Sequence, residues 1–357
     1  MDATILMHVT AAGKSYGLAI FAARTIAAAP LHDGSATRKM SGPTTDRPSY
    51  GKAHTMPPDV ANSSARGLVV AGLSASTSSQ NAVRWAAAEA ERHTAGLRLV
   101  HAYALPQLGQ PVQHDVDALL HDEASALLDR VADSTRRDHP HLEITTRLIQ
   151  EAPVNALRDE SRGAALTVVG ANDSSRLAGA ILGSVASAIA AVNPAPVAIV
   201  HPDHPVNGSG PVVVGVDGSA ASSAAIEFAF AEAAARKTEL LAVHARKKSF
   251  DEDSIPGDAS SFDPAGIGQE ETAVLADALA GWFSKYPDVV VTQEFRRGGA
   301  ATVLLETCRS ASIVVVGRRP RGEFVALVMG STSRELTAHS PCPVVIVRSR
   351  DTDRRED

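Results

Sequence analysis

The feature that most constrains the fold of this chain is an internal repeat. VVAGLSAS at residues 69–76 returns as VVVGVDGS at residues 212–219, which lie 143 positions later. PAPVAIV at residues 194–200 returns as PCPVVIV at residues 341–347, now 147 positions later, so the second copy has gained four residues internally. Similar blocks that keep their order along the chain indicate a duplicated domain.

The repeat divides the 357 residues into four parts. We assign copy one to residues 66–202 and copy two to residues 209–349, with a linker rich in Pro, Gly and Asn between them. Residues 1–65 are predicted to be a disordered leader, because residues 31–66 are rich in Pro, Gly, Ser and Thr and show little periodicity. The charged tail, residues 350–357, has mixed signs and is also predicted to be disordered.

Each copy alternates short β-branched runs with helical patterns. In copy two, PVVVGVD indicates a strand buried on both faces, and the apolar residues Ala225, Phe228, Ala229 and Ala233 then follow a helical spacing. Five strands alternating with helices predict an α/β fold in which each copy is a doubly wound, five-stranded parallel sheet of Rossmann-like type. Such sheets bind ligands at the carboxyl ends of their strands, near the switch in strand order.

Composition excludes several classes of protein. Lys and Arg number 34 against 40 Asp and Glu, and this net charge of -6 lacks the basic footprint of a nucleic-acid binder. No stretch has the roughly 20 apolar residues of a membrane-spanning helix. The only cysteines are Cys308 and Cys342, too few for a disulfide scaffold, which favours the cytoplasm. Cys342 lies between two prolines before a buried strand, which predicts an inert core thiol.

Catalytic and metal signals are weak in this sequence. No G-x-S-x-G elbow occurs, and no nucleophile stands at a suggestive spacing from a base. His114 and His121 share one face of a predicted helix, but the pattern favours a solvated helix face over a metal site. We therefore expect no metal ligands and no catalytic residues.

The first strand of copy two ends in an acidic turn, Asp217-Gly218-Ser219. A carboxylate at this sheet edge can accept hydrogen bonds from a base amine or a ribose hydroxyl. The alternative is a cap on the following helix, a role for which Asp and Ser are both suited. The residues alone do not separate these two interpretations.

The fourth strand of copy two ends in Gly317, followed by RRPRG, and Gly330-Ser331 follows 13 residues after Gly317 at a predicted helix start. Glycine lets a backbone approach a phosphate, helix N-terminal amides and hydroxyls hold anions, and arginines supply forked donors. The alternative is an ordinary glycine turn with solvated arginines. The convergence with Asp217 on one sheet end favours an anion site.

These motifs resemble those of tandem universal stress proteins, over nearly everything from residue 66 to residue 349. The resemblance rests on VVVGVDGSAASSAAIEFA, LLAVHA, VVVGRRPRGEF with MGSTSREL, and the terminal SPCPVVIV. It implies the adenine nucleotide alpha hydrolase-like fold, and ATP-binding members carry Gly-x2-Gly-x9-Gly-Ser/Thr. Gly317 matches the first glycine, Gly330 the third and Ser331 the hydroxyl. Pro320 replaces the middle glycine and removes an N–H donor, with Gly322 two residues further on.

The resemblance implies that copy two binds ATP, with or without Mg²⁺. Asp217 would contact the adenine and ribose, Ala245 would line the base pocket, and Ser331 and Ser333 would hold phosphates. The full set of expected binding residues is Val216, Asp217, Ala245, Gly317, Arg318, Arg319, Gly322, Gly330, Ser331 and Ser333. No enzymatic activity is expected beyond slow ATP hydrolysis.

Copy one departs further from this pattern. Ser74 stands where copy two has Asp217, and Ala186 replaces the hydroxyl of Ser333. Asp173 occupies the middle glycine position and adds negative charge to a would-be phosphate loop. We therefore expect a degenerate nucleotide site in copy one and a structural role for that half.

The sequence thus predicts a cytoplasmic stress-response regulator that binds ATP in copy two and acts on an unidentified protein partner. A ligand-free interaction module is the alternative. An adenylating enzyme ranks lower, because DGSAASS after the first strand lacks the paired glycines of a pyrophosphate loop. The resemblance also implies that the strands PVAIV and PVVIV pair the copies into an intrachain pseudo-dimer, with a further homodimer left open.

Overall fold

The structure is a computed structural model with two separate units, Met1–Met56 and Pro57–Asp357. It describes residues 6–11, 14–19, 67–104, 112–171, 183–246, 273–318 and 329–349. The first unit contains an antiparallel pair, β1 (Leu6–Ala11) and β2 (Lys14–Ala19), inside the leader that the sequence predicts to be disordered. β-branched and aromatic residues such as Val9 and Tyr16 favour strands there. The rest of the leader and the tail lie outside the described residues.

The second unit contains both copies. The described elements of copy one are β3 (Leu68–Leu73), α1 (Thr77–Arg92), β4 (Gly96–Ala102), α2 (Val112–Asp138), β5 (Ile144–Ile149), α3 (Pro153–Glu160), β6 (Leu166–Gly170), α4 (Ser184–Val192) and β7 (Val197–Val200). Those of copy two are β8 (Val212–Val216), α5 (Ala220–Arg236), β9 (Leu240–Arg246), helical residues 273–279, β10 (Val291–Arg297), α7 (Ala300–Thr307), the 3-10 turn η3 (Cys308–Ser310), β11 (Ile313–Arg318), α8 (Ser331–His339) and β12 (Val344–Arg348).

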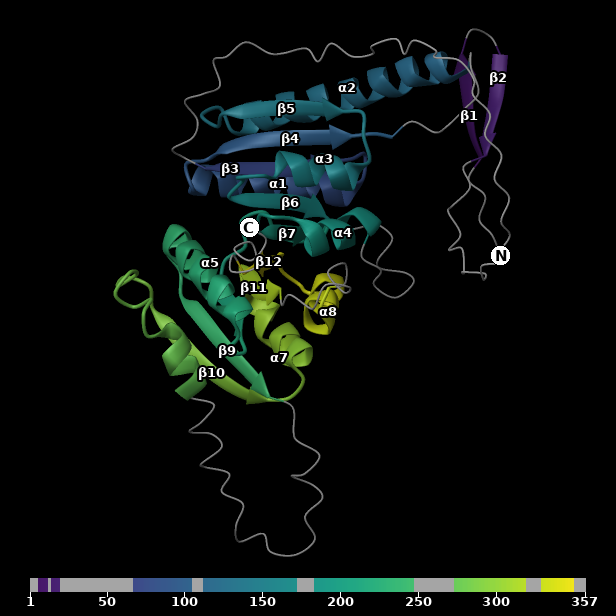
Figure 1. Cartoon of the computed structure of the whole chain (residues 1–357). Coiled ribbons are helices and arrows are strands. Elements are labelled where there is room, and N and C mark those ends of the chain that lie inside the picture. The colour runs from purple at the N-terminus through teal and green to yellow at the C-terminus, as the bar shows by residue number, and fades with distance from the viewer. Residues whose placement is uncertain are drawn as a thin grey trace, which may run out of the picture. The chain divides into compact units, whose positions relative to one another are not determined.

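The strands form one ten-stranded sheet in the order β10-β9-β8-β11-β12-β7-β6-β3-β4-β5 (Figure 1). Within each copy all neighbouring strands are parallel, which confirms the predicted doubly wound α/β class. The copies join through β7 and β12, which pair antiparallel with Val345 opposite Ala198. This is the pairing of fifth strands that the resemblance implies.

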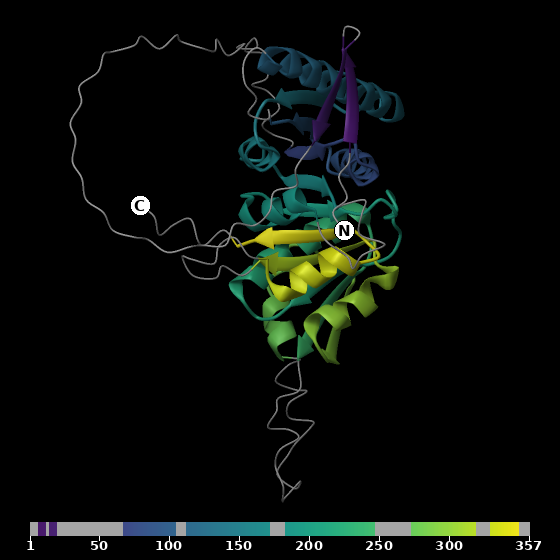
Figure 2. The ribbon, with the colours of Figure 1, turned by 90° about the vertical axis from the view of Figure 1, so that its right-hand side faces the viewer.

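Helices cover both faces of the sheet, which explains why the strands are continuous apolar runs rather than alternating ones. Valines of β8 and β11 are buried on both faces, and all four residues of β7 are buried. On one face, α1 and α5 pack their alanines and aromatic residues against the strands; α3, α4, α7 and α8 cover the other face. Figure 2 shows α8 beside β12, both in yellow.

Five charged or titratable side chains meet where α1 and α5 lie side by side: Glu89, Arg92, His93, Glu232 and Arg236, here named the helix seam. The Arg236 guanidinium contacts Glu89 of the other copy and Glu232 of its own helix, the latter at 3.2 Å from Nε to Oε2. His93 Nε2 donates to Glu232 Oε1 at 2.8 Å. Both carboxylates are buried.

The helix seam has a pseudo-twofold pattern. Glu89 and Glu232 are repeat equivalents 143 positions apart, and so are His93 and Arg236. Each glutamate therefore pairs with a base from the opposite copy, an arginine in one case and a histidine in the other. The hydrogen bond to Glu232 raises the pKa of His93, although burial opposes it. Burial, together with the charge of Glu232, raises the pKa of Glu89.

Ligand atoms of Glu89, His93 and Glu232 lie within 4.8 Å of one another, a spacing that a metal ion can use. However, the guanidinium groups of Arg92 and Arg236 already contact these carboxylates. The positive charge that a cation would supply is thus present in the protein itself. We interpret the helix seam as an ion-pair network that joins the copies.

Candidate ligand site at the carboxyl edge of the sheet

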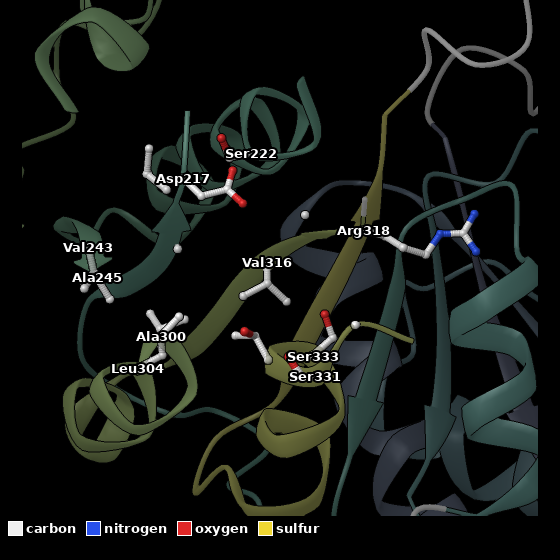
Figure 3. A pocket seen from close by; sticks show the side chains of 15 residues that line it. Asp217, Ser222, Val243, Ala245, Ala300, Leu304, Val316, Arg318, Ser331 and Ser333 are labelled. Atoms are coloured by element: carbon white, nitrogen blue, oxygen red, sulfur yellow. The ribbon is translucent and has the colours of Figure 1, made fainter. Parts of the chain in front are cut away.

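A pocket of about 280 Å³ opens at the carboxyl end of β8 and β11, where the strand order of copy two reverses (Figure 3). This is the place where doubly wound sheets bind ligands. We name it the copy-two pocket. Its lining residues are Gly215, Val216, Asp217, Ser222, Val243, Ala245, Ala300, Leu304, Val316, Gly317, Arg318, Gly330, Ser331, Thr332 and Ser333.

Asp217 stands at the exposed rim of this pocket, one residue after β8 ends. Its Oδ1 accepts hydrogen bonds from both the backbone N–H of Ser219, at 3.0 Å, and the Ser219 hydroxyl. Ser219 in turn caps α5, because its Oγ accepts from the Ser222 N–H at 3.3 Å. Ser219, and not Asp217, therefore caps α5. The hydrogen bonds from Ser219 hold the Asp217 carboxylate in position at the pocket.

Gly317 lines the pocket, and its lack of a side chain also lets the end of β11 pack closely against α5. A Cβ at Gly317 would lie 2.2 Å from the carbonyl oxygen of Ala221, in the first turn of α5. A Cβ at Gly170, the copy-one equivalent, would lie 2.6 Å from the backbone nitrogen of Ser79 in α1. Only glycine lets the strand end approach the helix this closely. The first glycine of the sequence motif is therefore required by the fold in both copies.

Gly330 differs from Gly317 in this respect. No described heavy atom lies within 4 Å of a Cβ built there, so its small size serves no contact within the described chain. Gly330 is the N-cap of α8, and among the described side chains none caps this helix end. The first-turn N–H groups of a helix have no intrahelical partner, and they favour anions. With exposed Ser331 and buried Ser333, this helix end suits a phosphate group.

The opposite part of the lining is apolar. Val243 and Ala245 come from β9, Val316 from β11, and Ala300 and Leu304 from α7. The sequence predicted Ala245 but not the other four, nor the lining residues Gly215, Ser222 and Thr332. The signal available for Leu304 was its repeat equivalent Leu157, which lies 147 positions earlier and lines the matching pocket of copy one.

Arg318 lines the copy-two pocket, but its guanidinium points away from the other lining side chains in Figure 3. Burial lowers the pKa of Arg318 to about 10, and the nearby charge of Arg348 adds to this. The structure thus does not aim this guanidinium at the pocket. Arg319 and Gly322, the remaining predicted binding residues, lie outside the described residues, as does Pro320.

Copy one has a matching pocket of about 260 Å³ at the carboxyl end of β3 and β6, here named the copy-one pocket. Its lining residues are Gly72, Leu73, Ser74, Ser76, Ser78, Ser79, Val100, Ala102, Pro153, Leu157, Val169, Gly170, Ala171, Gly183, Ser184, Val185 and Ala186. The Ser74 hydroxyl replaces the Asp217 carboxylate and accepts from the Ser76 N–H at 3.4 Å. Asp173 lies outside the described residues.

Two histidines at equivalent positions join neighbouring strands at the carboxyl edge of the sheet. His101 Nδ1 donates to the Leu73 carbonyl at 2.8 Å, and its repeat equivalent His244 donates to the Val216 carbonyl at 2.7 Å. Each ring ties the end of the second strand to the end of the first. His121 contacts the Tyr103 hydroxyl at 3.1 Å, and the side chain of His114 lies outside the described residues.

A duplicated, doubly wound sheet with a pocket at each switch point defines the class of this protein as a tandem Rossmann-like α/β protein. The sequence matches the Universal stress protein family over residues 67–201 and again over residues 209–348. The chain therefore belongs to the universal stress protein family and carries two Usp domains in tandem.

Similar proteins support this membership. A universal stress protein of Mycolicibacterium smegmatis is 34% identical over 293 residues, covering 79% of this chain and 97% of that protein. One from Mycobacterium tuberculosis is 34% identical over 295 residues, covering 78% and 96%. The crystal structure of a universal stress protein from Archaeoglobus fulgidus has a TM-score of 0.61 at 17% identity, covering 81% of this chain and 99% of that one, which shows the shared fold. Among the described helices, none is long and apolar enough to cross a membrane.

Proposed function

We propose that copy two binds ATP and that the protein acts as a nucleotide-dependent regulator in the stress response. One observation carries the proposal: the copy-two pocket brings the Asp217 carboxylate, an apolar wall and the uncapped N-terminus of α8 to one switch point. A carboxylate suits the hydroxyls and amines of a nucleoside, the wall suits a base, and the helix end suits phosphates. The family resemblance supports the same assignment.

The residues present fit the ligand on two physical grounds. As far as the described residues go, Gly330 leaves space where an alanine methyl would stand, directly at the helix end that favours an anion. Ser331, Thr332 and Ser333 add hydroxyl donors along the same turn. ATP, with Mg²⁺ or without it, would supply the negative charge that this end of α8 complements. Within the proposal the protein binds and responds; the described residues of the pocket include no nucleophile–base pair that would support catalysis.

Calorimetric titration of the full chain with ATP, with and without Mg²⁺, tests the proposal. We expect one nucleotide per chain, and we expect Asp217→Ala and Gly330→Ala each to weaken binding at least tenfold. The matched control is Ser74→Ala, which alters the equivalent position of copy one and should leave the affinity unchanged. Absence of binding to the wild type under both conditions would overturn the proposal in favour of a ligand-free interaction module. Substrate-dependent release of pyrophosphate would instead support an adenylating enzyme.

A further inference from the structure

The two cysteines of the chain, 34 positions apart in sequence, lie together in the core of copy two. Cys308 stands in η3 at the end of α7, and Cys342 stands in the short segment between α8 and β12. The sulfur atoms of both lie 3.6 Å from the same atom, the Oγ of Ser340. Neither thiol is in a disulfide.

Ser340 is fixed in place by the backbone around it. Its hydroxyl donates to the Cys342 carbonyl at 2.7 Å and its Oγ accepts from the Cys342 N–H at 3.3 Å. The hydroxyl hydrogen is therefore used by the Cys342 carbonyl, and the Cys308 thiol donates to the Leu305 carbonyl oxygen at 3.6 Å. Both sulfur atoms are thus held 3.6 Å from one oxygen atom whose own position is fixed.

The surroundings of the two thiols are unequal. The hydrogen bond from Cys342 lowers the pKa of Cys308 to about 7, and the opposite effect of the same bond, with burial, raises the pKa of Cys342. Cys308 is therefore the better nucleophile of the two, since the thiolate is the reactive form. Both side chains are buried, at 0% and 2% exposure, so only a small reagent can reach them.

We propose that Cys308 and Cys342 are a redox pair that forms an intramolecular disulfide when the protein meets hydrogen peroxide. Cys308 first loses its proton, and its thiolate attacks one peroxide oxygen. The O–O bond breaks to give a sulfenic acid and a hydroxide, and the hydroxide takes up the released proton to form one water. The sulfur of Cys342 then attacks the Cys308 sulfur, the S–O bond breaks, and a second water leaves with the Cys342 proton. Two thiols and one peroxide thus yield one disulfide and two waters, and a dithiol reductant, itself oxidised to a disulfide, returns the pair to two thiols.

The position of the pair gives the disulfide a structural consequence. Residues of α7 and α8 line the copy-two pocket at their N-terminal ends, and the thiols join the segments at their C-terminal ends. A disulfide would draw the sulfur atoms to about 2.05 Å and fix these two ends to each other. The proposal itself does not require that the pocket bind a nucleotide.

The test uses the reduced full chain, treated with hydrogen peroxide and then denatured in the presence of N-ethylmaleimide. We expect the untreated protein to take up two maleimides. We expect the treated protein to take up none, to lose about 2 Da of mass by intact mass spectrometry, and to regain both thiols with dithiothreitol. Peptide mapping should recover a Cys308–Cys342 cross-link.

Single substitutions assign the two roles. In Cys342→Ala, the Cys308 sulfenic acid should persist and be captured by dimedone; in Cys308→Ala, Cys342 should keep its thiol. Retention of two alkylatable thiols by the wild type, under conditions that fully oxidise free glutathione, would overturn the proposal. So would disulfides formed only between chains. The wild-type measurement decides the question even where a substituted protein folds poorly.

Discussion

The copy-one and copy-two pockets have nearly the same shape and different chemistry. They lie at equivalent switch points, and both are lined by a glycine at the end of the fourth strand and by a leucine of the helix before that strand, α3 or α7. Four pairs of equivalent lining residues differ in polarity: Ser74 and Asp217, Ala171 and Arg318, Val185 and Thr332, Ala186 and Ser333. The fold maintains a cavity in both copies, whereas only copy two carries an acid and three consecutive hydroxyl residues at the start of its last helix, α8.

The helix seam provides a second comparison, between Arg236 and its equivalent His93. We expect Arg236→Met to give the largest loss of stability, because it leaves two buried carboxylates facing each other without their shared cation. Breaking a buried ion pair typically costs about 3–5 kcal/mol. Urea denaturation measures the free energy of unfolding. His93→Gln is the matched control and should cost about 1 kcal/mol or less, because His93 is partly exposed. Equal losses of stability in the two variants would contradict this expectation and would show that Arg236 and His93 contribute equally to the helix seam.

The strand-end glycines should behave alike in the two copies. We expect Gly317→Ala and Gly170→Ala each to lower the free energy of unfolding by about 2–3 kcal/mol, because the added methyl meets helix backbone that cannot give way. Gly330→Ala should change stability by less than about 0.5 kcal/mol, since no atom of the described residues lies within 4 Å of its methyl group. Denaturation curves of all three variants check this. If Gly330→Ala were clearly destabilised, its weaker ATP binding could no longer be attributed to a local change at the copy-two pocket.

Exchanging hydroxyls between the pockets sharpens their comparison. Ser333→Ala gives copy two the residue that copy one has at that position, Ala186. Loss of one hydrogen bond to a charged group should weaken ATP binding about tenfold, which corresponds to roughly 1.4 kcal/mol. The reciprocal Ala186→Ser should leave the affinity and the stoichiometry of one unchanged, because Ser74 and Val185 still differ from copy two. A second bound nucleotide in Ala186→Ser would refute the assignment of copy one as degenerate.

The smallest expected effect is a pH dependence of the helix seam. Because the folded-state pKa of His93 is raised, its ion pair with Glu232 contributes fully below the unfolded-state pKa of about 6.5. The contribution is lost as pH rises through the folded-state value. Between pH 6 and pH 9 the free energy of unfolding should therefore fall further in the wild type than in His93→Gln. We expect this difference to be small, below about 1 kcal/mol. Parallel curves for the two proteins would show that His93 does not titrate in the seam.

The class of fold could be predicted from the sequence because most strands are valine-rich runs, and because these runs recur in the same order in both copies of the repeat. The helix seam could not, since Glu89 and Arg236 are 147 positions apart and meet only once β7 docks on β12. Asp217 and the start of α8 were found from turn chemistry. The apolar wall from α7 was missed because Ala300 and Leu304 carry no motif. The orientation of Arg318 depends on its burial, which a sequence pattern does not encode.

The antiparallel pairing of β7 and β12 joins two similar domains of one chain in the way that a twofold axis would join two identical single-domain subunits. In a homodimer the twofold operator forces every residue to appear twice, so an arginine at one end of the seam would be an arginine at the other. Fusion of the two copies removes that constraint. A residue of one copy can then change while its equivalent in the other copy stays the same. The helix seam, with arginine in one copy and histidine in the other, and the two pockets of different polarity both show this loss of symmetry.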